Sequence, residues 1–235
     1  MAACAKTAMI LAAGRGERMR PLTDSLPKPL LGVGGKPVVV WQLERLARAG
    51  FGRAVINHAH LGAMIEAALG DGSRWGLELS YSAEPEALES AGGIRQALPL
   101  IGTDSFAVVN SDVYTDYDYR LLSGRLEAMQ APAGVLAHLV LVDNPPHHPG
   151  GDFFFEGGRP VDRGARRLTY SGIGAYRREL FERLVPGAKH RLAPLITEAI
   201  ASGRASAEHH RGVWFDVGTP QRLAQLDAML TERQG

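Results

Sequence analysis

The chain has 235 residues, of which 45% are hydrophobic and 22% are charged, and its formal net charge is +1. This length and composition are typical of one large globular domain, or of one domain with an appended lobe. The small net charge does not favour nucleic acid or an anionic membrane as a partner, and no stretch approaches the ~20 apolar residues of a membrane helix. The single cysteine, Cys4, excludes a disulfide framework and indicates a reducing compartment such as the cytoplasm. No feature indicates an obligatory protein partner.

The first apolar run, residues 8–13, is short enough for one buried strand and ends in a turn rich in glycine and positive charge. Arg15, Arg18, Arg20 and Lys28 follow closely, and Lys28 stands between two prolines that restrict the backbone around it. A buried strand that runs into such a loop is how α/β proteins present backbone N–H groups to phosphates. A plain turn with a solvated basic loop is the alternative interpretation.

Strand and helix patterns alternate over the first ~140 residues. Strands are expected at 53–57, 77–81, 106–109 and 135–142, and helices at 38–49, 61–69, 94–98 and 119–129. This alternation predicts an α/β fold, with a Rossmann-like, mostly parallel sheet flanked by helices. Ligands of such sheets bind at the carboxyl ends of the strands, where the polar residues of this chain also stand: Gly14, Asn57, Glu84, Asn110 and Asp112.

The pattern changes after residue 142. A loop of proline, glycine and histidine at 143–152 precedes expected strands at 153–155, 167–176 and 213–217 and expected helices at 179–184, 192–200 and 221–230. Thr219 and Pro220 suit the cap and first turn of the last helix. We therefore expect one domain over 1–235, in which 143–235 forms a small mixed β/α lobe beside the nucleotide-binding type of sheet at 1–142.

Two aspartates are the candidate metal ligands. Asp112 and Asp216 each end or follow an apolar strand, in FAVVNSD and VWFDVG. Mg²⁺ is typically held by one or two carboxylates together with phosphate oxygens and water. For either aspartate alone, a turn or a helix cap is the competing interpretation. The histidine pairs 58/60, 147/148 and 209/210 lack the HExxH spacing and are interpreted as loop or surface residues.

The opening stretch resembles a known signature. LAAGRGERMRPLTDSLPKPL is similar to the LAAGxGTRLxPLTxxxPKPL pattern of sugar-1-phosphate nucleotidyltransferases, and the later segments around 84–93, 110–112 and 214–219 match that family in order. INHAHLG, NSDVYTDYD, LVDNPPHHPGGDF and WFDVGTP are most like the branch of bacterial uridylyltransferases that act on N-acetylmuramate 1-phosphate. That branch serves peptidoglycan recycling in the cell wall.

The resemblance implies a role for each matching residue. The nucleotide would be bound by Ala12, Ala13, Gly14, Gly16, Glu17, Arg18, Lys28, Glu84 and Gly92. Within that set, Arg18 would contact the β- and γ-phosphates and Lys28 the transferring α-phosphate, and Glu84 would lie at the base with Gly92 beside it. Asn110, Asn144 and Asp152 would contact the sugar, and Asp112 and Asp216 would hold Mg²⁺.

The implied reaction is in-line attack of a sugar 1-phosphate on the α-phosphorus of UTP, which releases pyrophosphate. Positioning and electrostatics would carry such a transfer, because both reactants are anions. Within the class, transfer from GTP or another nucleotide to mannose 1-phosphate or glucose 1-phosphate is the alternative. A non-catalytic nucleotide-sugar sensor is the alternative from another class. The incomplete glycine patterns disfavour a P-loop or dinucleotide-binding protein.

Overall fold

The computed structural model describes residues 5–129 and 134–232, so Cys4 lies outside the described residues. The helices are α1 (Leu22–Ser25), α2 (Val38–Arg48), α3 (Gly62–Leu69), α4 (Glu89–Ile101), α5 (Tyr119–Ala128), α6 (Glu179–Glu182), α7 (Leu192–Ala201) and α8 (Pro220–Glu232). Short 3₁₀ turns, η1 to η3, cover Glu17–Met19, Lys28–Leu30 and Ser73–Trp75. None of the helices in the described ranges is long and apolar enough to cross a bilayer.

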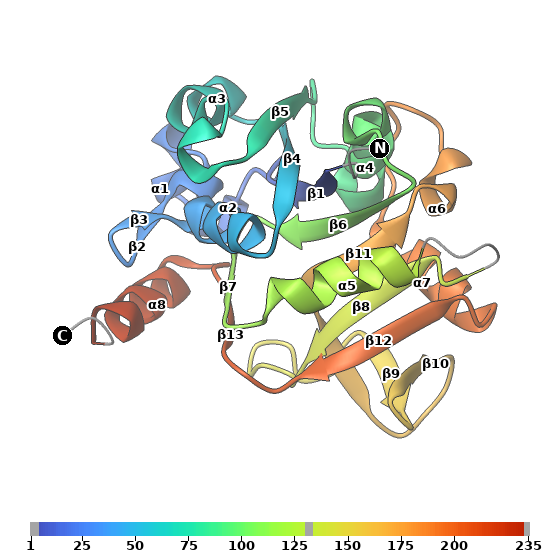
Figure 1. The fold of residues 1–235 in the computed structure, drawn as a ribbon. Helices are drawn as coiled ribbons and strands as arrows, with labels where there is room; N and C mark the ends of the chain where they lie inside the picture. The colour runs from blue at the N-terminus through green and yellow to red at the C-terminus, as the bar shows by residue number, and fades with distance from the viewer. Residues whose placement is uncertain (1–4, 130–133, 233–235) are drawn as a thin grey trace.

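The large sheet is formed by β1 (Lys6–Leu11), β4 (Phe51–His58), β5 (Glu78–Ala83), β6 (Ser105–Asn110), β8 (Ala137–Val142), β9 (Phe153–Glu156), β10 (Arg159–Val161), β11 (Arg167–Arg177) and β12 (Ala205–His210). Strands β5, β4, β1 and β6 run parallel in that order. The long strand β11 lies antiparallel to β6 and also pairs with β8 and β9, so it joins the two parts of the chain. This mixed, mostly parallel sheet with flanking helices confirms the predicted fold class (Figure 1).

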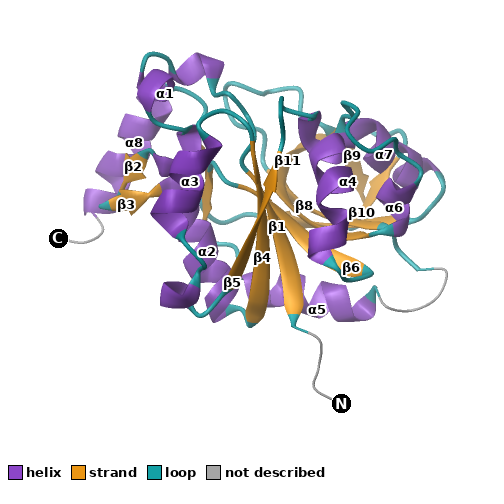
Figure 2. Ribbon diagram, turned by 90° about the horizontal axis from the view of Figure 1, so that it is seen from above, coloured by secondary structure: helices purple, strands orange, loops and turns teal. Residues whose placement is uncertain are grey.

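Alternation along the strands separates two layers of core. In β1, Ala8 and Ile10 face the side covered by α2, α3 and α5, whereas Met9 faces the side covered by α4, α6 and α7. Figure 2 shows α2 and α3 on one side of the sheet and α4 and α6 on the other. Because both faces are covered, the central strands β1 (KTAMIL) and β6 (SFAVVN) are apolar in their middles and carry polar residues toward their ends.

A third cluster holds the last helix against the first part of the chain. Leu226 and Leu230 of α8 pack with Met19, Val33 and other side chains that flank the small sheets β2 (Gly32–Val33) with β3 (Lys36–Pro37) and β7 (Val113–Thr115) with β13 (Trp214–Asp216). Figure 1 shows α8 beside the β2–β3 hairpin. Residues that lie two hundred positions apart in sequence therefore meet at one edge of the molecule.

Helix α4 and strand β12 differ from the sequence prediction, which also did not include the short elements α1, β2, β3, β7 and β10. Helix α4 begins at Glu89 instead of residue 94, because the backbone N–H groups of Ala91 and Gly92 donate to the carbonyl of His190 at 2.9 and 3.1 Å. Strand β12, with the sequence ASAEHH, was not predicted. Its polar composition carries no apolar alternation, and its backbone pairing with β8 depends on a neighbour far away in sequence.

Candidate active site at the carboxyl ends of the strands

The carboxyl ends of three parallel strands lie side by side. Leu11 stands opposite Asn57 on β4 and opposite Asn110 on β6. The Asn57 carboxamide accepts a hydrogen bond from the backbone N–H of Ala12 at 2.9 Å and donates to a carboxylate oxygen of Glu84 at 2.6 Å. These bonds orient the start of the glycine-rich turn.

Glu84 lies behind Asn57. Its second carboxylate oxygen accepts from the backbone N–H of Leu88 at 2.8 Å, and only 4% of the residue is exposed. Burial raises the pKa of the Glu84 carboxyl above its ordinary value, although the hydrogen bonds from Leu88 and Asn57 oppose that shift. A Cβ atom at Gly93 would lie 2.6 Å from both Asn57 Nδ2 and Glu84 Oε1, so a glycine is needed for this packing.

Lys28 reaches the end of β6 from the opposite side. It opens the 3₁₀ turn η2 and forms an ion pair with Asp112, in which both side chains are largely buried. Gly16 has a φ of 68° and lies directly on the Lys28 side chain. The hydroxyl of Thr23 donates to the Gly16 carbonyl at 2.9 Å, and Arg15 donates to the Thr23 carbonyl at 2.6 Å. Arg15 therefore supports the turn.

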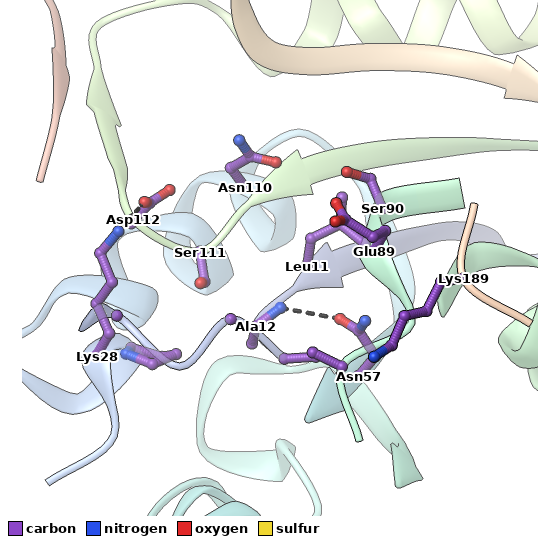
Figure 3. Close-up of a pocket in the computed structure, with 15 residues that line it drawn as sticks. Leu11, Ala12, Lys28, Asn57, Glu89, Ser90, Asn110, Ser111, Asp112 and Lys189 are labelled. Atoms are coloured by element: carbon purple, nitrogen blue, oxygen red, sulfur yellow. Dashed lines mark hydrogen bonds and ion pairs between the residues drawn. The ribbon is translucent and has the colours of Figure 1, made fainter. Parts of the chain in front are cut away.

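The first cavity, which we call the strand-end cavity, has a volume of about 440 Å³. In Figure 3, Lys28 and Asp112 lie at one end of it, whereas Glu89, Ser90 and Lys189 lie at the other. Its walls are mostly backbone and small side chains, with a lysine at each end. It is lined by Leu11, Ala12, Ala13, Gly14, Gly16, Lys28, Pro29, Asn57, Ala87, Glu89, Ser90, Asn110, Ser111, Asp112 and Lys189.

Asp112 and Asp216 come together through the small sheet of β7 and β13. Asp216 pairs in register with Val113, and the backbone N–H of Val217 donates to the carbonyl of Asp112 at 2.8 Å. Each carboxylate faces cationic groups of the chain. Lys28 contacts Asp112, whereas Arg222 lies 3.0 Å and His147 lies 3.1 Å from Asp216.

The Asp216 carboxyl is partly removed from water. Burial raises its pKa above the ordinary value and the negative charge of Asp112 adds to that shift, while Arg222 and His147 oppose it. Two adjacent carboxylates with unfavourable mutual charge are the oxygen donors that a hard divalent cation takes. Within residues 5–129 and 134–232, no group of three or more acidic, histidine or cysteine side chains gathers into a closed metal centre. The pair would therefore leave coordination positions for phosphate oxygens and water.

A second, larger cavity opens on the other side of Asp216. We call it the α8 cavity, because Arg222 and Gln225 of α8 and Thr219 just before that helix line it. Its volume is about 790 Å³. The loop at 143–149 and the strands β12 and β13 provide the remaining walls. It is lined by Arg18, Val142, Asp143, Asn144, Pro145, Pro146, His147, His210, Gly212, Trp214, Phe215, Asp216, Thr219, Arg222 and Gln225.

Most of the site residues predicted from the sequence line one of these two cavities. The strand-end cavity contains Ala12, Ala13, Gly14, Gly16, Lys28, Asn110 and Asp112, and the α8 cavity contains Arg18, Asn144 and Asp216. Four predicted residues line neither cavity: Glu17, Glu84, Gly92 and Asp152.

Each of these four residues has another setting. Glu17 is exposed near Arg15 and Arg20. A Cβ atom at Gly92 would overlap the carbonyl of Ala188, so this glycine permits the 185–191 loop to approach α4. Asp152 accepts hydrogen bonds from the backbone N–H of Tyr170 at 2.8 Å and from His148 at 3.0 Å, and so holds its own loop. Glu84 orients Asn57, as described above.

Sequence reasoning missed three residues at the site: Lys189, His147 and Arg222. Lys189 lies in the loop between α6 and α7 and pairs with Glu86 at 2.7 Å, so its place depends on packing between distant segments. His147 belongs to a histidine pair that lacks metal-ligand spacing. Arg222 lies in the first turn of α8, just after the turn at residues 218–220. Its closeness to Asp216 in the sequence is the one local signal that could have indicated it.

Comparison with known proteins agrees with this geometry. Residues 7–149 match the model of the family described as nucleotidyl transferase. The chain is 52% identical, over 94% of its length and 97% of the relative, to N-acetylmuramate alpha-1-phosphate uridylyltransferase of Neisseria meningitidis serogroup B. It is 32% identical, over 99% of its length and 100% of the relative, to the protein of the same name from Caulobacter vibrioides.

The structural neighbours have the same fold at low sequence identity. A glucose-1-phosphate thymidylyltransferase candidate from Bacillus anthracis superposes with a TM-score of 0.85 at 20% identity, over 96% of this chain and 95% of the other. A UDP-glucose pyrophosphorylase superposes with a TM-score of 0.79 at 15% identity, over 99% and 100%. On the family match, the two relatives and the shared fold, the chain belongs to the nucleotidyl transferase family and is most like its sugar-1-phosphate uridylyltransferases.

Proposed function

We propose that this protein transfers UMP from UTP to N-acetylmuramate 1-phosphate, with Mg²⁺, and releases pyrophosphate. The observation that carries the proposal is the meeting of Lys28, Asp112 and Asp216 between two cavities. The choice of base and sugar rests on the two uridylyltransferase relatives, which the chain matches over nearly its full length.

The strand-end cavity is the proposed site of UTP. The backbone of Ala13, Gly14 and Gly16 lines this cavity just after the end of a buried strand, a setting that suits a triphosphate. The ion pair with Asp112 and the packing on Gly16 hold the Lys28 ammonium group in place. Lys28 would donate to the oxygens of the α-phosphate and stabilise the charge that they gain during the transfer.

Asp112 and Asp216 would hold Mg²⁺, since the β7–β13 ladder places the two residues side by side and carboxylate oxygens are the donor type that this cation takes. Bound there, the ion would supply positive charge for the phosphate oxygens of both substrates. The apo arrangement of Lys28 on Asp112 and Arg222 on Asp216 supports this assignment, because the chain's own cations neutralise both carboxylates.

The acceptor would enter the α8 cavity with its 1-phosphate toward Asp216. A phosphate oxygen would form the new bond to the α-phosphorus of UTP while the bond to the β-phosphate oxygen breaks, so that pyrophosphate leaves with that electron pair. A phosphate monoester has already lost most of its second proton at pH 7, so no general base is required. The chain's part is to align two anions and offset their repulsion, which reaches about 4 kcal/mol for unit charges 4 Å apart at a dielectric of 20.

The proposed setting is the bacterial cytoplasm, where the product UDP-N-acetylmuramate would re-enter cell-wall synthesis through peptidoglycan recycling. The single cysteine in the sequence is in keeping with a reducing compartment.

A substrate panel tests the proposal. Purified protein would be incubated with Mg²⁺, each of UTP, GTP, CTP and dTTP, and the 1-phosphates of N-acetylmuramate, N-acetylglucosamine, mannose and glucose, with pyrophosphate release as the measurement. We expect UTP with N-acetylmuramate 1-phosphate to give the highest kcat/KM, and EDTA to abolish it. Higher turnover of another pair would overturn the specificity. Binding of UTP without turnover of any pair would favour the sensor.

A further inference from the structure

The α8 cavity contains an arginine to which the proposed reaction has given no role. Arg222 is the third residue of α8, its side chain is 11% exposed, and its backbone N–H donates to the Thr219 hydroxyl at 3.3 Å. The Leu226 and Leu230 side chains one and two turns later are fully buried, which fixes the helix and hence the root of this arginine. Arg222 is therefore held in place from both ends.

The guanidinium group of Arg222 is only partly satisfied. Its Nη1 atom contacts both oxygens of Asp216, at 3.1 and 3.0 Å, whereas its buried Nε–H has no hydrogen-bond partner among the described residues. Buried polar groups are nearly always hydrogen-bonded, so a native donor left without a partner calls for an explanation. One such explanation is that the Nε–H of Arg222 gains its hydrogen-bond partner when a ligand binds.

A second guanidinium lies beside it. A Cβ atom at Gly218 would overlap the Arg222 guanidinium and would lie 3.4 Å from Nη2 of Arg18, so both groups pass over the same glycine. Arg18 forms no hydrogen bond or ion pair within the described part of the chain. Two neighbouring guanidinium groups repel each other, and the Asp216 carboxylate, which pairs with Arg222, offsets only part of this charge. The cavity wall between them is therefore suited to an oxyanion.

We propose that Arg222 binds an oxyanion of the acceptor sugar. This inference rests on the proposed function, which places the acceptor in the α8 cavity. N-acetylmuramate 1-phosphate carries two oxyanions, the phosphate at C1 and the carboxylate of the lactyl ether. A planar guanidinium group forms charge-assisted hydrogen bonds with either of them.

The test compares Arg222→Gln and Arg222→Lys with the wild-type protein. Arg120→Gln is the matched control, because Arg120 is exposed and pairs only with its neighbour Asp118. We expect Arg222→Gln to raise the KM of N-acetylmuramate 1-phosphate by about 10- to 100-fold, as lost hydrogen bonds to a charged group generally do. Arg222→Lys keeps the charge but loses the planar fork, so it should show a smaller rise.

Two further measurements separate this role from support of Asp216. We expect the KM of UTP and the Mg²⁺ concentration for half-maximal turnover to stay within about twofold of the wild type. The variant would lose only binding energy for the acceptor, which is the same in the ground state and the transition state. A shift in the Mg²⁺ requirement that matches the loss of turnover would overturn the proposal, since Arg222 would then act through Asp216.

Binding without turnover supplies a readout that does not depend on the chemistry. In EDTA, the rise in Tm on adding N-acetylmuramate 1-phosphate should be present in the wild type and in Arg120→Gln and be lost in Arg222→Gln. An equal rise in all three would overturn the proposal. If the wild type binds the sugar but turns over no pair of the substrate panel, the proposed function fails while this binding role stands.

N-acetylglucosamine 1-phosphate, which lacks the lactyl carboxylate, distinguishes the two oxyanions. A similar loss with both sugars would place the C1 phosphate on Arg222. A loss confined to the muramate would place the carboxylate there. No loss with either sugar, in a folded variant with the wild-type Tm, would remove Arg222 from acceptor binding.

Discussion

Asp112 lines the strand-end cavity and its neighbour Asp216 lines the α8 cavity, yet the two cavities are built in opposite ways. The first is formed by backbone and small side chains at the ends of β1, β4 and β6, which neighbour one another in one parallel sheet. The second is formed by side chains from η1, the loop at 143–149, β12, β13 and α8, elements that come from both ends of the chain.

The difference suggests a division of labour between the two halves of the proposed site. A triphosphate is the same in every nucleotide, so a backbone cradle with one placed lysine can bind it in any member of the family. The acceptor differs from enzyme to enzyme, and side chains on loops and a terminal helix can change without disturbing the sheet. We therefore expect substitutions at the junction to abolish turnover and those in either cavity to change affinity.

The largest expected effect is at the junction. Asp112→Asn keeps the shape of the side chain but removes the charge that pairs with Lys28 and that would hold Mg²⁺. We expect kcat to fall by about 10³-fold, in the range found when preorganised electrostatic contacts are removed from an active site. Pyrophosphate release measures this, and circular dichroism and Tm report the fold. An Asp112→Asn protein with near wild-type turnover would exclude Asp112 from the metal site.

Lys28→Ala should come next, with a fall in kcat of about 10²-fold and little change in Tm. Lys36→Ala is the contrasting control. Lys36 pairs with Glu44 at 2.7 Å and its ammonium group lies 3.6 Å over the Trp41 ring, away from both cavities. The substitution should reduce stability by about 1 kcal/mol and leave kcat unchanged. If Lys28→Ala instead behaves as Lys36→Ala does, the lysine between the prolines is structural.

Lys189 tests whether the far end of the strand-end cavity belongs to the nucleotide. Removing its ammonium group in Lys189→Ala should raise the KM of UTP by about 5- to 10-fold and leave the KM of the acceptor unchanged, since only a hydrogen bond to the nucleotide is lost. Glu86→Gln, which frees Lys189 from its 2.7 Å ion pair, is the companion variant and should not weaken UTP binding. A rise in the KM of the acceptor instead would assign Lys189 to acceptor binding.

These two halves also differ in how far the sequence predicts them. The Ala8–Lys28 stretch is predicted because strand, glycine turn and lysine are consecutive, so local rules of backbone geometry apply. The strand-end patterns marked Asp112 and Asp216 as a candidate pair but could not show that they meet, and the β7–β13 ladder brings the two residues together. Lys189 could not be found in this way, because its position follows from tertiary packing of the 185–191 loop. For Arg222 the sequence offered only its closeness to Asp216, and its place at the site follows from the packing of α8.

Glu84 and β12 show the same limit of prediction from the sequence. The family resemblance implies that Glu84 lies at the base of the nucleotide, and that assignment stays a prediction. The contacts of its two oxygens, with the Asn57 carboxamide and the backbone N–H of Leu88, do not follow from its place after a strand. A short polar segment at 205–210 carries no strand signal, yet its pairing with β8 forms one wall of the α8 cavity through His210. In both cases the partners that decide the outcome are distant in sequence or are backbone groups.

The smallest expected effect on turnover, and one confined to stability, concerns Glu208 on β12. Burial opposes its ionisation, but hydrogen bonds from His138 and Tyr117 and the charge of Arg125 outweigh burial and lower its pKa to about 2. Because the folded-state pKa lies below the ordinary value of 4.5, ionised Glu208 stabilises the fold above pH 4.5, and this contribution is lost as the pH falls toward 2.

Glu208→Gln should therefore lower the free energy of unfolding by about 1–3 kcal/mol at pH 7, and by progressively less as the pH falls through that window. Urea unfolding of both proteins across the pH series measures the difference. Glu198→Gln, which breaks an exposed pair with Arg183, is the control and should leave the free energy of unfolding nearly unchanged at every pH. A Glu208→Gln penalty that is the same at pH 3 and pH 7 would show that packing, and not the charge of Glu208, holds β12 against the sheet.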